Sequence, residues 1–157
     1  MKNLGHRYEL HRRVEGDGYQ GSGTMLLIGL APDTAPDEYN SPDIRAAMAL
    51  ARAAGCADLV MCNLFAARIF KPRLLWEHPD PVGPKNDTTL ARWADEADTI
   101  VAWWGDEVDL RGRDDEVLSL LSWRDVWATG VSESLQPRSV LAGELAVFQA
   151  LEGERLW

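Results

Sequence analysis

The chain has 157 residues, a length typical of one domain around one hydrophobic core, and we expect a single domain over residues 1–157. Its 25 acidic and 16 basic residues leave a formal net charge of −9. That charge disfavours binding to duplex DNA, because non-specific affinity for nucleic acids comes mostly from basic side chains that neutralise the phosphates. No apolar run approaches the roughly 18 residues that cross a bilayer, and the first residues lack the apolar block of a secretory signal, so we expect none. Cys56 and Cys62 form no C-x-x-C pair, so we expect reduced thiols in a cytoplasmic protein without a membrane partner.

The first half of the chain alternates short apolar segments with polar ones. Residues 8–14 alternate apolar and polar side chains and predict a half-exposed strand that ends at a glycine-rich turn. Residues 24–30 and 58–65 are short apolar runs typical of strands buried on both faces. Between them, a proline-rich acidic loop over 32–42 leads into an alanine-rich helix over 43–54.

The second half repeats this alternation after a long loop over residues 66–84. Two helices are expected, from a cap at Asn86 or Asp87 to about residue 97, and around residues 117–121. Two further strands are expected at 99–105 and 123–129, and the apolar spacing of Leu141, Leu145, Phe148 and Leu151 predicts a helical tail over 141–157. The strand–helix alternation predicts the α/β class, with a mostly parallel sheet covered by helices.

Polar residues stand just after the expected strands, where ligands bind in open α/β sheets. Gly29, Pro32 and Asp33 follow the first buried strand, Asn63, Phe65 and Arg68 lie at the end of the second, and Trp104 ends the third. Each also has a purely structural interpretation. Gly29 and Pro32 can shape a turn, Asn63 can cap its own loop, Arg68 can form a surface ion pair, and Trp104 can belong to the core.

Two basic segments are candidate anion sites. Arg68, Lys71 and Arg73 gather positive charge in one loop of an acidic chain, which favours a phosphate or carboxylate ligand. Arg138, in a late loop, can also stabilise an anion. Phosphate-loop, dinucleotide-binding and nucleophile-elbow motifs are absent, and the three histidines and two cysteines lack zinc spacing, so we expect no cofactor and no metal.

Six segments, in order, resemble a family of small bacterial and phage proteins, domain of unknown function 1643. They are L-A-P-D-T-A over 30–35, S-P-D-I-R over 41–45, N-L-F-A-A-R over 63–68, D-P-V-G-P-K-N-D over 80–87, W-W-G over 103–105, and P-R-S-V-L over 137–141. The resemblance covers about residues 7–141. It implies an N-terminal strand pair before the central sheet, and it adds Asp80, Asn86 and Asp87 to the candidate binding residues.

The same order of motifs is similar to a remote uracil-DNA glycosylase fold. That resemblance implies a three-layer α/β/α arrangement with a central, mostly parallel four-stranded sheet. It also implies that Asn63 reads the edge of a base, Asp33 orients water, and Phe65 or Trp104 stacks on the base. Three positions depart from the motifs of the domain of unknown function 1643 family. Its P-R-H-P motif is Pro-Arg-Ser-Val here, so Ser139 replaces a histidine. Ala31 and Ser41 replace an asparagine and an aspartate of its first two motifs.

Three functions follow as expectations. The first is an enzyme acting on a nucleobase or nucleotide, by N-glycosidic cleavage or a related base modification, with Asp33, Asn63 and Arg138 as its catalytic residues. The second is a catalytically degenerate module that binds a nucleotide or single-stranded nucleic acid, which the replaced polar residues favour. The third is an acidic protein-interaction protein, a phage or host effector, which the charge and the seven tryptophans favour.

Overall fold

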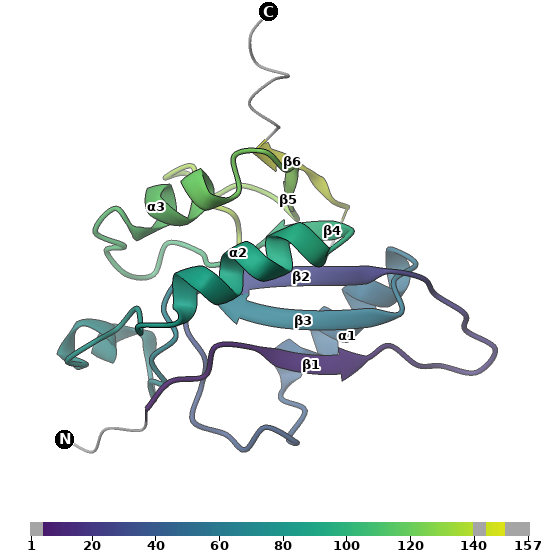
Figure 1. Ribbon diagram of the computed structural model, residues 1–157, viewed down its shortest axis with the longest axis horizontal. Coiled ribbons are helices and arrows are strands. Elements are labelled where there is room, and N and C mark those ends of the chain that lie inside the picture. Colours follow the sequence, from purple (N-terminus) through teal and green to yellow (C-terminus); the bar gives the residue numbers. More distant parts are fainter. Residues whose placement is uncertain (1–4, 140–143, 150–157) are drawn as a thin grey trace, which may run out of the picture.

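Six strands form one mixed sheet at the centre of the computed structural model, which describes residues 5–139 and 144–149 (Figure 1). The strands are β1 (Leu10–Arg13), β2 (Thr24–Gly29), β3 (Asp58–Asn63), β4 (Thr99–Ala102), β5 (Val126–Ala128) and β6 (Ala146–Gln149), and their order across the sheet is β1-β3-β2-β4-β5-β6. The four middle strands are parallel, whereas β1 and β6 are antiparallel at the two edges. The predicted α/β class and the parallel centre of the sheet are confirmed.

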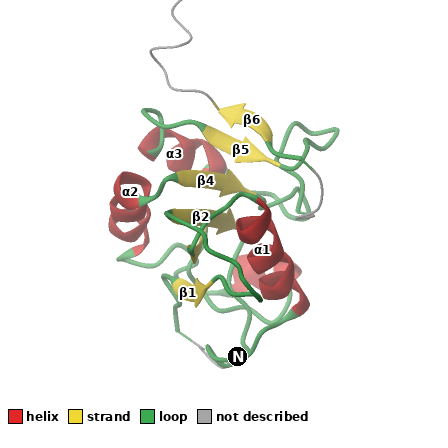
Figure 2. Cartoon of the chain, turned by 90° about the vertical axis from the view of Figure 1, so that its right-hand side faces the viewer, coloured by secondary structure: helices red, strands yellow, loops and turns green. Residues whose placement is uncertain are grey.

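Helices pack on both faces of the sheet, with α1 (Pro42–Ala53) on one face and α2 (Asn86–Glu96) and α3 (Arg113–Leu120) on the other (Figure 2). A short 3-10 helix, η1 (Pro72–Glu77), lies in the long loop after β3. The Ser41 hydroxyl accepts a hydrogen bond from the Ile44 N–H at 3.2 Å, which caps α1. None of the described helices is long and apolar enough to span a membrane.

The alternating side chains of the middle strands build two core clusters. On β2, Leu26 and Ile28 face α2 and α3, whereas Met25 and Leu27 face α1, and all four are fully buried. Burial on both faces explains why these strands are almost continuously apolar in the sequence. Both cysteines are buried and free, as expected.

The strand order creates a switch point beside β2. The chain leaves β2 for β3 on one side and later returns to place β4 on the other side. Right-handed crossovers in opposite directions put the connecting helices on opposite faces and separate the loops at the carboxyl end of β2. Gly29 at the end of β2 is aligned with Asn63 at the end of β3. A ligand crevice is therefore expected where these two residues meet.

Two expectations about the edges of the sheet are corrected. β1 belongs to the same sheet and pairs with β3, so residues 8–14 do not form a separate strand pair before the central sheet, and the four expected parallel strands are joined by an antiparallel strand at each edge. The predicted tail helix is replaced by β6, although Leu141 and Leu151 lie outside the described residues. Leu145 packs with the α1 cluster and Phe148 with the opposite cluster. An odd spacing puts side chains on opposite faces of a strand, whereas a helix would place these two on one face.

Candidate functional site

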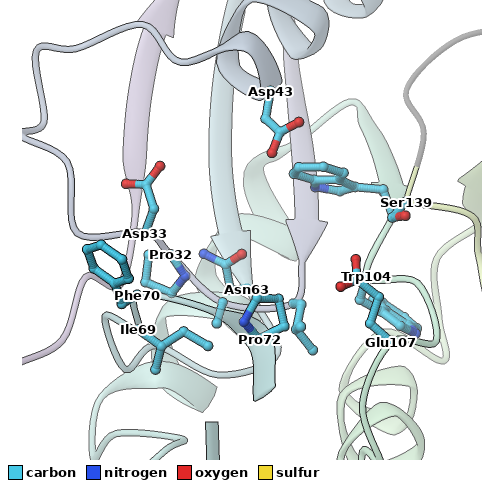
Figure 3. Close-up of a pocket in the computed structure, with 13 residues that line it drawn as sticks. Pro32, Asp33, Asp43, Asn63, Ile69, Phe70, Pro72, Trp104, Glu107 and Ser139 are labelled. Carbon is cyan, nitrogen blue, oxygen red and sulfur yellow. The ribbon is translucent and has the colours of Figure 1, made fainter. Parts of the chain in front are cut away.

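An open cavity of about 330 Å³ lies at the carboxyl ends of β2, β3 and β4 (Figure 3). Its polar and aromatic lining consists of Asp33, Asp43, Asn63, Glu107, Ser139, Phe70, Trp103 and Trp104. The remaining wall is apolar and includes Pro32. This volume is at the lower end for small-molecule sites, so it suits one or two fused rings rather than a large cofactor.

Asn63 stands at the centre of the cavity, and Gly29 makes room for it. A Cβ atom on Gly29 would lie 2.8 Å from Asn63 Oδ1 and 2.9 Å from Trp103 Nε1. Glycine therefore allows the amide and the indole to approach the end of β2 closely. Within residues 5–139 and 144–149, the Asn63 amide has no hydrogen-bond partner, so its donors and acceptor are available to a ligand.

A buried scaffold behind the cavity fixes the backbone of Asn63. Asn86, which is fully buried, donates from Nδ2 to the carbonyl oxygens of Asn63 and Leu64, both at 3.0 Å. Arg113, also buried, donates from Nε to the same Leu64 oxygen at 2.8 Å and pairs with Asp87 at 2.6 Å. Asn86 and Asp87, expected as binding residues, thus hold the end of β3 and do not line the cavity.

Asp80 also has a structural role, because it stabilises the turn before α2. Its carboxylate accepts a hydrogen bond from the Gly83 N–H at 3.2 Å, and its own N–H donates to His78 Nδ1 at 2.9 Å. Its carbonyl oxygen lies 2.8 Å from His6 Nε2. Asp80 is absent from the cavity wall and shapes the turn that packs against the segment after β3.

Arg68 holds the loop that follows β2. Its guanidinium donates to the carbonyl oxygens of Asp33, Thr34 and Ala35 at 3.3, 3.1 and 2.9 Å. Arg7 donates to the Ala35 oxygen at 2.6 Å and pairs with the Asp33 carboxylate at 3.5 Å. The Asp33 carboxylate also accepts from the Ala35 N–H at 3.0 Å. Asp33 therefore reaches the cavity in a loop whose backbone is bound by two arginines.

The other expected cationic residues lie outside the cavity wall. Lys71 and Arg73 are exposed near η1, and Arg138 is exposed with its side chain packed over Gly130. Ser139, the next residue, does line the cavity and lies against Gly105. The arginine expected to be catalytic is thus not brought together with Asn63, whereas Ser139 is.

Asp43 is a lining residue that the sequence reasoning missed. It lies in the first turn of α1, and its carboxylate points into the cavity above Asn63 (Figure 3). Surrounding protein atoms remove part of the hydration of this carboxyl group and raise its pKa, and the negative charge of Asp33 raises it further. An acid in the first turn of a helix that follows a functional loop is a signal that could have identified it.

The aromatic residues divide between core and cavity. Trp104 is only 2% exposed, donates from Nε1 to Gln136 at 2.9 Å, and meets Phe148 edge to face. Phe65 is fully buried against Trp76 and does not line the cavity. Trp103 is half-buried and Phe70 is 73% exposed, so these two rings are the ones placed to meet a ligand.

Across the part of the chain that the structure describes, no group of three or more histidine, cysteine, aspartate or glutamate side chains could hold a metal ion.

Comparison with known proteins identifies one relationship. A family model described as a protein of unknown function, DUF1643, matches residues 7–138. No significant match was found among curated proteins or among solved structures. The matched region contains β1 to β5, all three helices and almost all of the cavity wall. The chain therefore belongs to the DUF1643 family.

Proposed function

We propose that the cavity binds a nucleobase and that the protein cleaves the N-glycosidic bond of that base or carries out a related base modification. The observation that carries the proposal is the unpartnered amide of Asn63 at the centre of a cavity at the switch point of the sheet. A primary amide offers both a donor and an acceptor, which matches the paired polar atoms on the edge of a base.

The surroundings of Asn63 support the binding of a flat ring. Phe70 and Trp103 supply aromatic faces on which a base can stack, in place of the buried Phe65 and Trp104. The order of motifs, with Gly29 and Pro32 after β2 and Asn63 ending β3, supports the further proposal of a uracil-DNA glycosylase-like arrangement.

The two carboxylates support the chemistry of the proposed cleavage. When an N-glycosidic bond breaks, positive charge develops on the sugar and the electron pair leaves with the base. Asp33 is placed to orient the water that attacks the sugar carbon and to accept the proton that this water loses, and its negative charge stabilises the developing cation. The Asp43 carboxylate points into the same cavity (Figure 3) and adds to this negative charge, and the departing base takes up a proton from solvent. Arg138 takes no part in this scheme.

A second candidate is a module that binds a base without cleaving it. Ser139 lines the cavity at the position where the family resemblance places a histidine. A neutral serine hydroxyl is a weaker stabiliser of a leaving base than an imidazolium. This candidate predicts ligand binding without release of free base.

The test is a thermal-shift screen with free bases and nucleosides, followed by chromatographic detection of released base. We expect one base class to raise the melting temperature of the natural protein and Asn63→Ala to abolish that shift. Asn40→Ala is the matched control, because Asn40 is exposed, accepts from Arg12 Nε at 2.7 Å and lies outside the cavity wall. A shift that survives in Asn63→Ala, or no shift with any compound, contradicts the proposal. A shift without base release selects the second candidate.

A further inference from the structure

Within residues 5–139 and 144–149, the ionisable residues of the cavity wall are all acidic. Asp33, Asp43 and Glu107 approach the cavity from three different segments, and the described lining includes no arginine, lysine or histidine. The field inside the cavity is therefore negative, and a ligand that brings positive charge into it gains electrostatic energy. A phosphate brought to the same place is repelled.

Three arginines beside and behind the cavity are held by other contacts. Arg7 and Arg68 bind the loop that carries Asp33, through its carbonyl oxygens and its carboxylate. Arg113 is buried behind β3, where it contacts Leu64 and Asp87. None of these three guanidinium groups can turn into the cavity without breaking the contacts that hold the wall in place. Arg7 partly neutralises Asp33, so most of the negative charge that faces the cavity comes from Asp43 and Glu107, which form no ion pair among the described residues.

The aromatic residues of the cavity wall also favour a cationic ligand. The faces of Trp103 and Phe70 attract cations through the ring quadrupole, and the attraction grows when both partners lose water. Burial and the neighbouring charge of Asp33 raise the pKa of Asp43, so negative charge on this carboxyl group is disfavoured. A cationic ligand would relieve that cost.

We infer that the cavity selects a nucleobase or nucleoside whose ring carries a positive charge, as N-methylated purines do, over the neutral parent and over nucleotides. This inference rests on the proposed function, since it assumes that a base occupies the space above Asn63. It goes beyond that proposal by specifying the charge of the substrate. Acidic residues and aromatic faces discriminate by charge, whereas the Asn63 amide reads hydrogen-bonding groups of the base.

The test compares matched ligands by isothermal titration at pH 6 and low ionic strength. The pairs are 1-methyladenosine with adenosine and 7-methylguanosine with guanosine, and adenosine 5′-monophosphate represents the anionic ligands. The two methyl groups lie on different edges of the purine, so a preference shared by both pairs reports charge rather than recognition of one edge. We expect each methylated nucleoside to bind at least tenfold more tightly than its parent, and the nucleotide to bind more weakly than adenosine.

Variants assign the preference to the cavity. Asp43→Asn should reduce the preference for the methylated nucleosides several-fold. Asp95→Asn removes the same charge from the exposed end of α2, at the opposite end of the sheet, and should leave the preference unchanged. A parent nucleoside or the nucleotide binding as tightly as the methylated compounds overturns the inference, and so does a preference in only one pair. If no compound binds, or if Asn63→Ala binds them all unchanged, the proposed function itself fails.

Discussion

Replacing Asn86 by aspartate tests the buried scaffold that holds the end of β3. The substitution preserves the shape of the side chain but removes both N–H donors that reach the Asn63 and Leu64 carbonyl oxygens. The other amide oxygen, Oδ1, is buried without a hydrogen-bond partner in the described residues. A carboxylate here would meet the Asn63 and Leu64 carbonyl oxygens, and the neighbouring Arg113 guanidinium already binds Leu64 and Asp87. We therefore expect the folded protein to keep this carboxyl group protonated.

The cost of that protonation depends on pH. Holding a carboxyl of ordinary pKa about 3.9 neutral at pH 7 costs about 4 kcal/mol, because each pH unit corresponds to about 1.36 kcal/mol. A protonated carboxyl donates one hydrogen bond where the amide donates two, which removes about 1 kcal/mol more. Because the pKa is raised in the folded state, the protonation cost is absent below about pH 3.9 and grows as pH rises. We expect Asn86→Asp to destabilise by about 5 kcal/mol at pH 7 and about 2.5 kcal/mol at pH 5.

Equilibrium unfolding in urea at pH 5, 6 and 7 measures this difference directly. Asn40→Asp is the matched control, because the Asn40 oxygen already accepts from Arg12 at the surface, and its effect should stay within about 0.5 kcal/mol. A destabilisation by Asn86→Asp below about 1 kcal/mol at pH 7 would contradict the two buried hydrogen bonds. So would a destabilisation that does not shrink between pH 7 and pH 5.

Two further substitutions address the cavity. Gly29→Ala places a Cβ 2.8 Å from Asn63 Oδ1 and 2.9 Å from Trp103 Nε1. The affinity for the ligand should therefore fall by at least tenfold, while the midpoint of urea unfolding drops only modestly. Unchanged affinity would show that Asn63 does not contact the ligand. Asp43→Asn should raise the melting temperature at pH 7 but not at pH 3.5, because burial and the charge of Asp33 raise the pKa of Asp43 from its ordinary 3.8, which makes the ionised form unfavourable above that pH. Equal melting temperatures at pH 7 would mean that the positive end of α1 offsets this cost.

Local patterns were sufficient to predict most of the elements. The apolar run over 24–30 became β2, Thr24–Gly29, and the alanine-rich segment over 43–54 became α1, Pro42–Ala53. Both signals lie within a dozen residues. The run over 24–30 is too short for a buried helix and follows a glycine-rich segment, whereas residues 43–54 show helical spacing. The tail was mispredicted because Leu145 and Phe148 fit a helical spacing in isolation, whereas pairing with β5 assigned them to opposite faces of a strand.

The candidate site was predictable in position but not in charge. Gly29, Pro32, Asp33 and Asn63 all lie in the cavity wall or at its base, because the carboxyl ends of parallel strands converge. Trp103 and Trp104 are neighbours in the sequence, yet the first is half-buried and open to the cavity while the second belongs to the core. Nothing local distinguishes them, since their exposure depends on what packs against each face of the chain after β4.

By itself, then, the sequence determined the class of fold, the parallel centre of the sheet and the edge at which a ligand is expected. The tertiary structure decided which charges meet there. Arg68 binds carbonyl oxygens more than 30 residues away in the chain, and Asp43 reaches the cavity only because α1 begins above the end of β3. Contacts between distant residues depend on the final packing of the elements, so Arg68 binds the backbone of a neighbouring loop, Lys71 and Arg73 stay exposed, and acidic side chains line the cavity.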